Sequence, residues 1–148
     1  METQPDFREL LALFSAHRVE HLIVGGYALA FHGAPRFTGD LDILVRPDAA
    51  NAQRIVTALE AFGFTSVGLT PNDFEHVDQV IQLGTPPVRI DLITSITGVS
   101  WDEAWAGRTA GRYGDIPVYY IGRAQFIANK RATGRMKDIA DLEVLGEA

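Results

Sequence analysis

Apolar positions in the first half of the chain follow the period of a helix in some stretches and of a strand in others. They recur every three or four residues from residue 7 to about residue 17 and again at residues 49–62, which predicts two amphipathic helices. Residues 21–24 form a short apolar run typical of a buried strand, and residues 41–45 alternate as a second strand does. A glycine pair ends the first strand, and a short helix is expected at residues 27–32.

The second half of the chain predicts further strands and three helices. Residues 71–78 are expected to form a polar loop, residues 101–105 a short helix, and residues 123–145 two helices broken at a Thr-Gly step. Apolar runs bounded by glycine, proline and polar residues predict four strands, at residues 64–67, 80–83, 88–94 and 116–121.

Composition narrows the class of protein. The 148 residues, 47% of them apolar, are expected to form a single domain over residues 1–148. The absence of cysteine excludes disulfides and cysteine-ligated zinc, so any metal would be a hard cation held mainly by oxygen ligands. A net charge of -6 argues against a protein that coats nucleic-acid duplexes. Without a long apolar stretch or a signal-peptide pattern, we expect a cytoplasmic protein with no membrane partner.

Two of the predicted strands present carboxylates on one face. Side chains alternate along a strand, so Asp40 and Asp42 point the same way, and Arg89 and Asp91 share a face of the strand at residues 88–94. Two carboxylates at i and i+2, with a third from another strand, are the usual protein contribution to a two-metal site for phosphoryl transfer. The alternative interpretation of these carboxylates is a solvated strand face.

The residues that precede the carboxylates have the chemistry to hold phosphate. Gly25 and Gly26 allow backbone N–H groups to approach a ligand at the start of a helix, although a tight turn is the commoner role of such a pair. Arg36 is positioned to neutralise a phosphate and Thr38 to steady the site by hydrogen bonding. An ordinary surface position is the alternative for Arg36.

The run from residue 24 to residue 45 resembles the signature of the DNA polymerase β-like nucleotidyltransferase superfamily. It is most similar to the small members, namely the minimal nucleotidyltransferases and the AbiEii-type toxin group. The signature is a Gly-Ser or Gly-Gly turn, a spacer, an Asp-x-Asp strand and a later Asp. Matching residues occur in this order: Gly25, Gly26, Asp40, Asp42 and Asp91. Gly26 stands where many members carry serine, so one side-chain contact to the triphosphate is missing.

This resemblance implies an α+β nucleotidyltransferase fold, with a mixed, mainly antiparallel β-sheet flanked by helices and a catalytic core at about residues 20–95. It implies that Asp40 and Asp42 bind two Mg²⁺ ions, with Mn²⁺ as a substitute, and that Asp91 completes the second site and helps to activate the acceptor hydroxyl. The implied reaction transfers a nucleoside monophosphate from a nucleoside triphosphate such as ATP and releases pyrophosphate. The acceptor is left open between a protein side chain, a tRNA end and a small molecule.

The C-terminal helical segment, at about residues 123–146, is also similar to the lysine-rich helix pair of AbiEii-like proteins. Lys130, Arg135 and Lys137 would then reach the nucleotide phosphates, because two metal ions neutralise a triphosphate incompletely. Asp138 would orient one of these cations. A solvated helix face with ordinary charge pairs is the alternative for each residue.

Two other functions are compatible with the sequence. The first is a nucleotide-binding or regulatory module that turns over poorly within a toxin-antitoxin system, with an antitoxin or a second copy of the chain as its partner. The second is a structural domain whose acidic face keeps it in solution. That domain would show no dependence of stability on magnesium or nucleotide.

Overall fold

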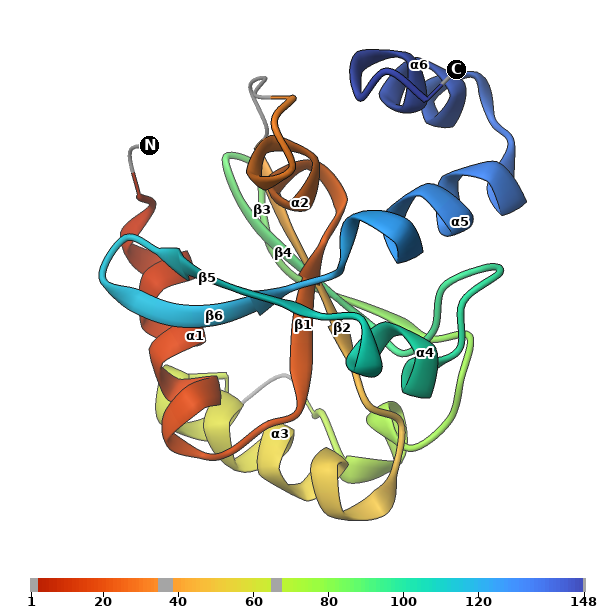
Figure 1. The fold of residues 1–148 in the computed structure, drawn as a ribbon. Helices are drawn as coiled ribbons and strands as arrows, with labels where there is room; N and C mark the ends of the chain where they lie inside the picture. The colour runs from red at the N-terminus through yellow and green to blue at the C-terminus, as the bar shows by residue number, and fades with distance from the viewer. Residues whose placement is uncertain (1–2, 35–38, 65–67, 148) are drawn as a thin grey trace.

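The computed structural model describes residues 3–34, 39–64 and 68–147, and it contains a six-stranded sheet with helices on both sides (Figure 1). The order of the strands across the sheet is β3-β4-β2-β1-β6-β5. The strands are β1 (His21–Val24), β2 (Asp40–Val45), β3 (Val80–Thr85), β4 (Val88–Ile93), β5 (Thr109–Tyr113) and β6 (Ile116–Tyr120).

The sheet is mixed and mainly antiparallel, as predicted. The pairs β1–β2, β3–β4 and β5–β6 are antiparallel, whereas β2–β4 and β1–β6 are parallel. The two central strands, β1 and β2, are the most deeply buried part of the sheet, which explains their nearly continuous apolar sequences. Strand β2 thus lies at the centre of the sheet with β1 on one side and β4 on the other.

The helices form two groups around this sheet. In Figure 1, α1 and α3 contact each other in the lower part of the view, while α2, α5 and α6 lie in its upper part. The helices are α1 (Pro5–Ala16), α2 (Gly25–Phe31), α3 (Ala49–Phe62), the short 3₁₀ helix η1 (Pro71–Phe74), α4 (Trp101–Ala106), α5 (Arg123–Thr133) and α6 (Met136–Val144). Among the described residues, no helix has the length and apolar character needed to cross a bilayer.

Local capping explains why several helix boundaries were predictable. The Asp48 side chain accepts a hydrogen bond of 2.7 Å from the Asn51 N–H at the start of α3, and Gly63 ends that helix with φ of 106°. Ser100 and Glu103 form a capping box at the start of α4. Gly134, with φ of 61°, separates α5 from α6.

Strand β5 was missed because its sequence, Thr-Ala-Gly-Arg-Tyr, lacks apolar alternation. It is an edge strand in which only Tyr113 is fully buried. Its extended conformation is stabilised by pairing with β6 and not by its own sequence pattern. The strand expected at residues 64–67 is wrong at Phe64, which lies outside any strand, and residues 65–67 fall outside the described part of the chain. The polar loop at residues 71–78 contains η1, whose Phe74 is fully buried.

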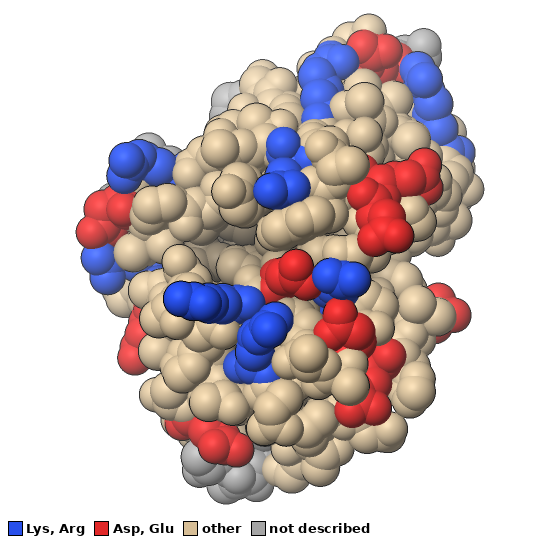
Figure 2. Space-filling view, turned by 60° about the horizontal axis from the view of Figure 1, so that its bottom comes forward, with Lys and Arg blue, Asp and Glu red and all other residues tan. Residues whose placement is uncertain are grey.

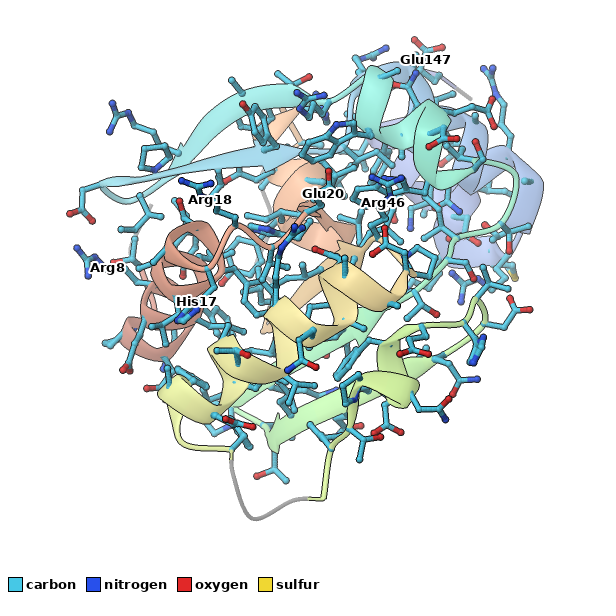
Figure 3. All side chains as sticks on the ribbon, turned by 90° about the horizontal axis from the view of Figure 1, so that it is seen from below. Arg8, His17, Arg18, Glu20, Arg46 and Glu147 are labelled. Carbon is cyan, nitrogen blue, oxygen red and sulfur yellow. The ribbon has the colours of Figure 1, made fainter. Side chains whose placement is uncertain are left out.

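Strand β3 is longer than the strand predicted at residues 80–83. Gly84 and Thr85 continue it, so the turn before β4 is confined to Pro86 and Pro87. At the end of the central strands away from α2, Arg46 pairs with Glu20 at 2.9 Å (Figure 3). The antiparallel register therefore places this ion pair and the beginning of α2 at opposite ends of β1 and β2.

Candidate active site

Four charged residues occupy one face of the sheet where β2 runs beside β4. The parallel register places Asp40 opposite Arg89 and Asp42 opposite Asp91. Residues two apart share a face, so all four side chains emerge on the same side of the sheet. The structure thus brings together the three carboxylates that the sequence singles out, which we call the carboxylate cluster: Asp40, Asp42 and Asp91.

Arg89 is part of this arrangement through direct contacts. Its Nε and Nη2 donate to the two carboxylate oxygens of Asp91 at 3.0 and 2.9 Å, and its Nε lies 3.8 Å from Oδ2 of Asp40. This is the two-pronged geometry that arginine forms with carboxylates. The sequence placed Arg89 and Asp91 on one face, which is confirmed, but gave Arg89 no role.

Asp42 is a partly buried carboxylate that lies close to two other carboxylates. Burial, together with repulsion from Asp91 and Asp40, raises the pKa of Asp42 to about 6. Lys137 and Arg89 oppose this rise. A cation near Asp42 would relieve both the repulsion and the cost of burying its charge.

Gly25 lies against the Asp42 carboxylate at the first position of α2. Its φ is 67°, and a Cβ atom at this position would overlap Oδ2 of Asp42. Glycine is therefore required here both for the left-handed backbone and for the close approach. This observation gives the predicted glycine turn a specific role, since it allows the chain to leave β1 and enter α2 directly beside the carboxylate cluster.

A cavity of about 660 Å³ connects this end of the sheet with the C-terminal helices. Its volume is typical of small-molecule sites. Gly25, Gly26 and Asp42 line it together with Lys130, Arg135 and Lys137, and all six were proposed from the sequence as site residues. Asp141 of α6 also lines the cavity. Arg36 and Thr38, the remaining nucleotide-binding candidates, lie outside the described residues.

Two of the three cations of this cavity, Lys130 and Arg135, are held by buried carboxylates of α6. Lys130, only 8% exposed, places its Nζ 3.3 Å from both Oδ1 of Asp138 and Oδ2 of Asp141. Arg135 Nε donates to Asp138 at 2.8 Å. Hydrogen bonding from Arg135 and other donors holds the pKa of Asp138 well below its usual range, so Asp138 is ionised.

Sequence reasoning expected Asp138 to contact one cation, and it contacts two. Asp141 was not anticipated, although its spacing of three from Asp138 on a helix was an available signal. Also unanticipated was the remaining wall of the cavity, which combines apolar with neutral polar side chains: Val24, Val80, Ile93, Ser95, Ile96, Thr97, Asn129, Ala132 and Thr133.

The carboxylate cluster fits a hard divalent cation in donor chemistry, because carboxylate oxygens are the ligands that Mg²⁺ and Mn²⁺ prefer. Among the described residues, however, no three acidic or histidine side chains converge as a ready-made ligand set. The Arg89 guanidinium contacts Asp91 and approaches Asp40. A cation held by all three carboxylates would therefore take the place of that guanidinium.

Solved structures with the same fold support this description of the architecture. The lincosamide antibiotic adenylyltransferase LnuA, in its lincomycin-bound crystal structure, superposes with a TM-score of 0.61 at 16% sequence identity and covers 97% of this chain and 96% of its own. A protein from Thermotoga maritima described as a nucleotidyltransferase gives a TM-score of 0.59 at 14% identity, over 99% of this chain and 94% of its own. An antigenic nucleotidyltransferase-like protein from Paracoccidioides brasiliensis gives 0.55 at 18% identity, over 96% and 73%.

These comparisons establish the fold of the chain. No protein-family model matches the sequence, and no curated protein matches it. The chain has the nucleotidyltransferase fold, as the sequence resemblance implied. The narrower likeness to the AbiEii-type group stays a prediction.

Proposed function

We propose that this protein is a nucleotidyltransferase that moves a nucleoside monophosphate from a nucleoside triphosphate to a hydroxyl group of an acceptor, with release of pyrophosphate. The observation that carries the proposal is the position of Asp42. This residue belongs both to the carboxylate cluster and to the lining of a cavity that also holds Lys130, Arg135 and Lys137. A carboxylate that can hold a cation, together with cationic side chains around the same cavity, suits a metal-bound triphosphate.

In this proposal the cationic side chains, the glycine pair and the carboxylates bind different parts of the metal-bound triphosphate. Lys130, Arg135 and Lys137 bind the phosphates that leave as pyrophosphate, since these groups gain negative charge during transfer. The backbone N–H groups of Gly25 and Gly26 begin α2, to which the N-cap residue Val24 gives no side-chain hydrogen bond, and they would bind a phosphate oxygen. Mg²⁺, or Mn²⁺ in its place, held by Asp40, Asp42 and Asp91, would neutralise the phosphates and lower the pKa of the acceptor hydroxyl.

The acceptor that we propose is a small molecule. The cavity combines polar groups with the apolar side chains of Val80, Ile93 and Ile96, the mixture found in small-molecule sites. LnuA, which shares the fold, is an adenylyltransferase for lincosamide antibiotics. The face of this protein in Figure 2 carries interspersed basic and acidic side chains and no continuous basic patch.

The second candidate is a nucleotide-binding module with weak turnover, which the Arg89–Asp91 pair favours because it occupies one of the three carboxylates. In that case the protein would bind a triphosphate without releasing pyrophosphate, and a role within a toxin-antitoxin system would then be the one to examine. A second copy of the chain or an antitoxin would be sought as its partner.

Thermal unfolding with each of the four nucleoside triphosphates, with and without Mg²⁺, tests the proposal. A Mg²⁺-dependent rise in Tm with at least one triphosphate is expected for the wild type and for the control Asp115→Asn, but not for Asp42→Asn. Asp115 is an exposed carboxylate on the β5–β6 turn and leaves the cavity unchanged. Pyrophosphate release with a panel of small hydroxyl compounds then separates an enzyme from a binding module. If no triphosphate changes the Tm of the wild type, both the proposed enzyme and the binding module are refuted.

A further inference from the structure

Arg89 contacts two of the three residues of the carboxylate cluster. Both prongs of its guanidinium engage Asp91, at 3.0 and 2.9 Å, and its Nε is 3.8 Å from Asp40. The Asp91 side chain is only 11% exposed and that of Arg89 33% exposed. This pair is therefore largely withdrawn from water, unlike the exposed ion pairs that contribute little.

We propose that Arg89 is a built-in counter-ion, which a divalent cation must displace from Asp91 when it binds to the carboxylate cluster. The inference rests on the proposed function, because it concerns the same three carboxylates. It assigns to Arg89 control over the affinity and the selectivity of the site for cations. Arg89 is thus a positioning residue for the carboxylates and acts before any chemistry.

The Arg89 guanidinium and a bound cation would use the same oxygens of Asp91. The guanidinium uses one lone pair on each oxygen of Asp91, the directions that a bridging cation would also use. The parallel register places Asp91 opposite Asp42 and Arg89 opposite Asp40, and the guanidinium contacts Asp91 while its Nε lies 3.8 Å from Asp40. A cation shared by the cluster would therefore compete with this guanidinium for the same carboxylate oxygens.

The Arg89 guanidinium also opposes a bound cation electrostatically. Three carboxylates on one face repel each other, and the positive charge of Arg89 offsets part of this repulsion through its contacts with Asp91 and Asp40. A doubly charged ion placed beside this guanidinium would be repelled strongly at such short range. The partial exposure of Arg89 gives its side chain a route toward solvent when a cation takes over its partner.

Mn²⁺ binding in the absence of nucleotide tests the proposal, with the free ion measured by its electron paramagnetic resonance signal. We expect Arg89→Gln to bind Mn²⁺ about tenfold more tightly than the wild type, which corresponds to about 1.4 kcal/mol. Arg89→Lys keeps the charge but not the two-pronged contact, so its Kd should lie between these two values. Arg8→Gln is the matched control, because Arg8 forms the same type of contact with Asp115 at 2.7 Å on the outside of α1, away from the cavity (Figure 3).

The outcomes separate this inference from the proposed function. The inference is overturned if Arg89→Gln binds Mn²⁺ no more tightly than the wild type. The proposed metal site is still supported in that case if the wild type binds Mn²⁺ and Asp42→Asn does not. Absence of Mn²⁺ binding in the wild type and in both Arg89 variants would overturn both. A shift for Arg89→Gln without any for Arg89→Lys would show that charge alone matters and would refute displacement of the paired arginine. Thermal unfolding of each variant confirms that it is folded.

Discussion

Replacing Asp138 by asparagine should destabilise the protein far more than the same change at an exposed aspartate. Asp138 is fully buried and accepts hydrogen bonds from the Arg135 backbone N–H at 3.1 Å, from Arg135 Nε at 2.8 Å and from Lys130 Nζ at 3.3 Å. Asparagine keeps the shape but removes the charge. Lys130, whose side chain is 10% exposed, is then left with Asp141 as its remaining carboxylate contact in the Lys130–Asp138–Asp141 group.

The expected size of this effect follows from the burial of the partners. Removing one member of a buried ion pair costs about 3–5 kcal/mol, and the retained contact of Lys130 with Asp141 places this case near about 3 kcal/mol. For a chain of this length, that corresponds to a fall in Tm of about 6–12 °C. The matched control is Asp115→Asn, which breaks an exposed contact with Arg8 and should cost less than about 1 kcal/mol.

Urea denaturation of the two variants and the wild type, followed over pH, is the appropriate assay. The folded-state pKa of Asp138 is lowered, so its stabilising effect is complete above the unfolded-state value of 3.8 and is lost as pH falls toward the folded-state value. The difference between Asp138→Asn and wild type should therefore be full at pH 7 and shrink below about pH 4. Equal costs for Asp138→Asn and Asp115→Asn at pH 7 would refute the reasoning that the α5–α6 ion pairs are structural.

Three further changes test other parts of the structure. Gly25→Ala should lower stability by about 1–3 kcal/mol more than Gly63→Ala, measured by urea denaturation, because both residues have positive φ but only the first would overlap Asp42; equal costs would contradict the close approach. Asp42→Asn should gain stability relative to wild type as pH rises from 4 to 7, because the pKa of Asp42 is raised to about 6 and its ionisation opposes folding; a pH-independent difference would contradict this sign. Asp48→Ala should lower the free energy of unfolding by about 1 kcal/mol, because α3 loses its N-terminal cap. Melting followed by circular dichroism measures this change, and an unchanged Tm would contradict the role of the cap.

The local sequence was informative wherever a short-range rule decides the outcome. The helices predicted at residues 49–62 and 101–105 begin where expected, because the caps Asp48 and Ser100 bind only near neighbours. Gly134 ends α5 for the same reason, since its backbone angle is a local property. The alternation of β2 placed Asp40 and Asp42 on one face for the same reason. Strand β5 was not predicted, because an exposed edge strand is stabilised by pairing with its neighbour and not by its own sequence pattern.

The amino-acid sequence by itself determined which residue types were available for chemistry: three strand carboxylates, a glycine pair and a basic C-terminal segment. Only the tertiary structure decided that Asp42 and Lys130 line one cavity, that Gly25 touches Asp42, and that Arg89 holds Asp91. The physical reason is that these contacts depend on the pairing of β2 with β1 and β4 and on the docking of α5 and α6. Such long-range packing is set by the burial of the whole core, which no local pattern of residues specifies.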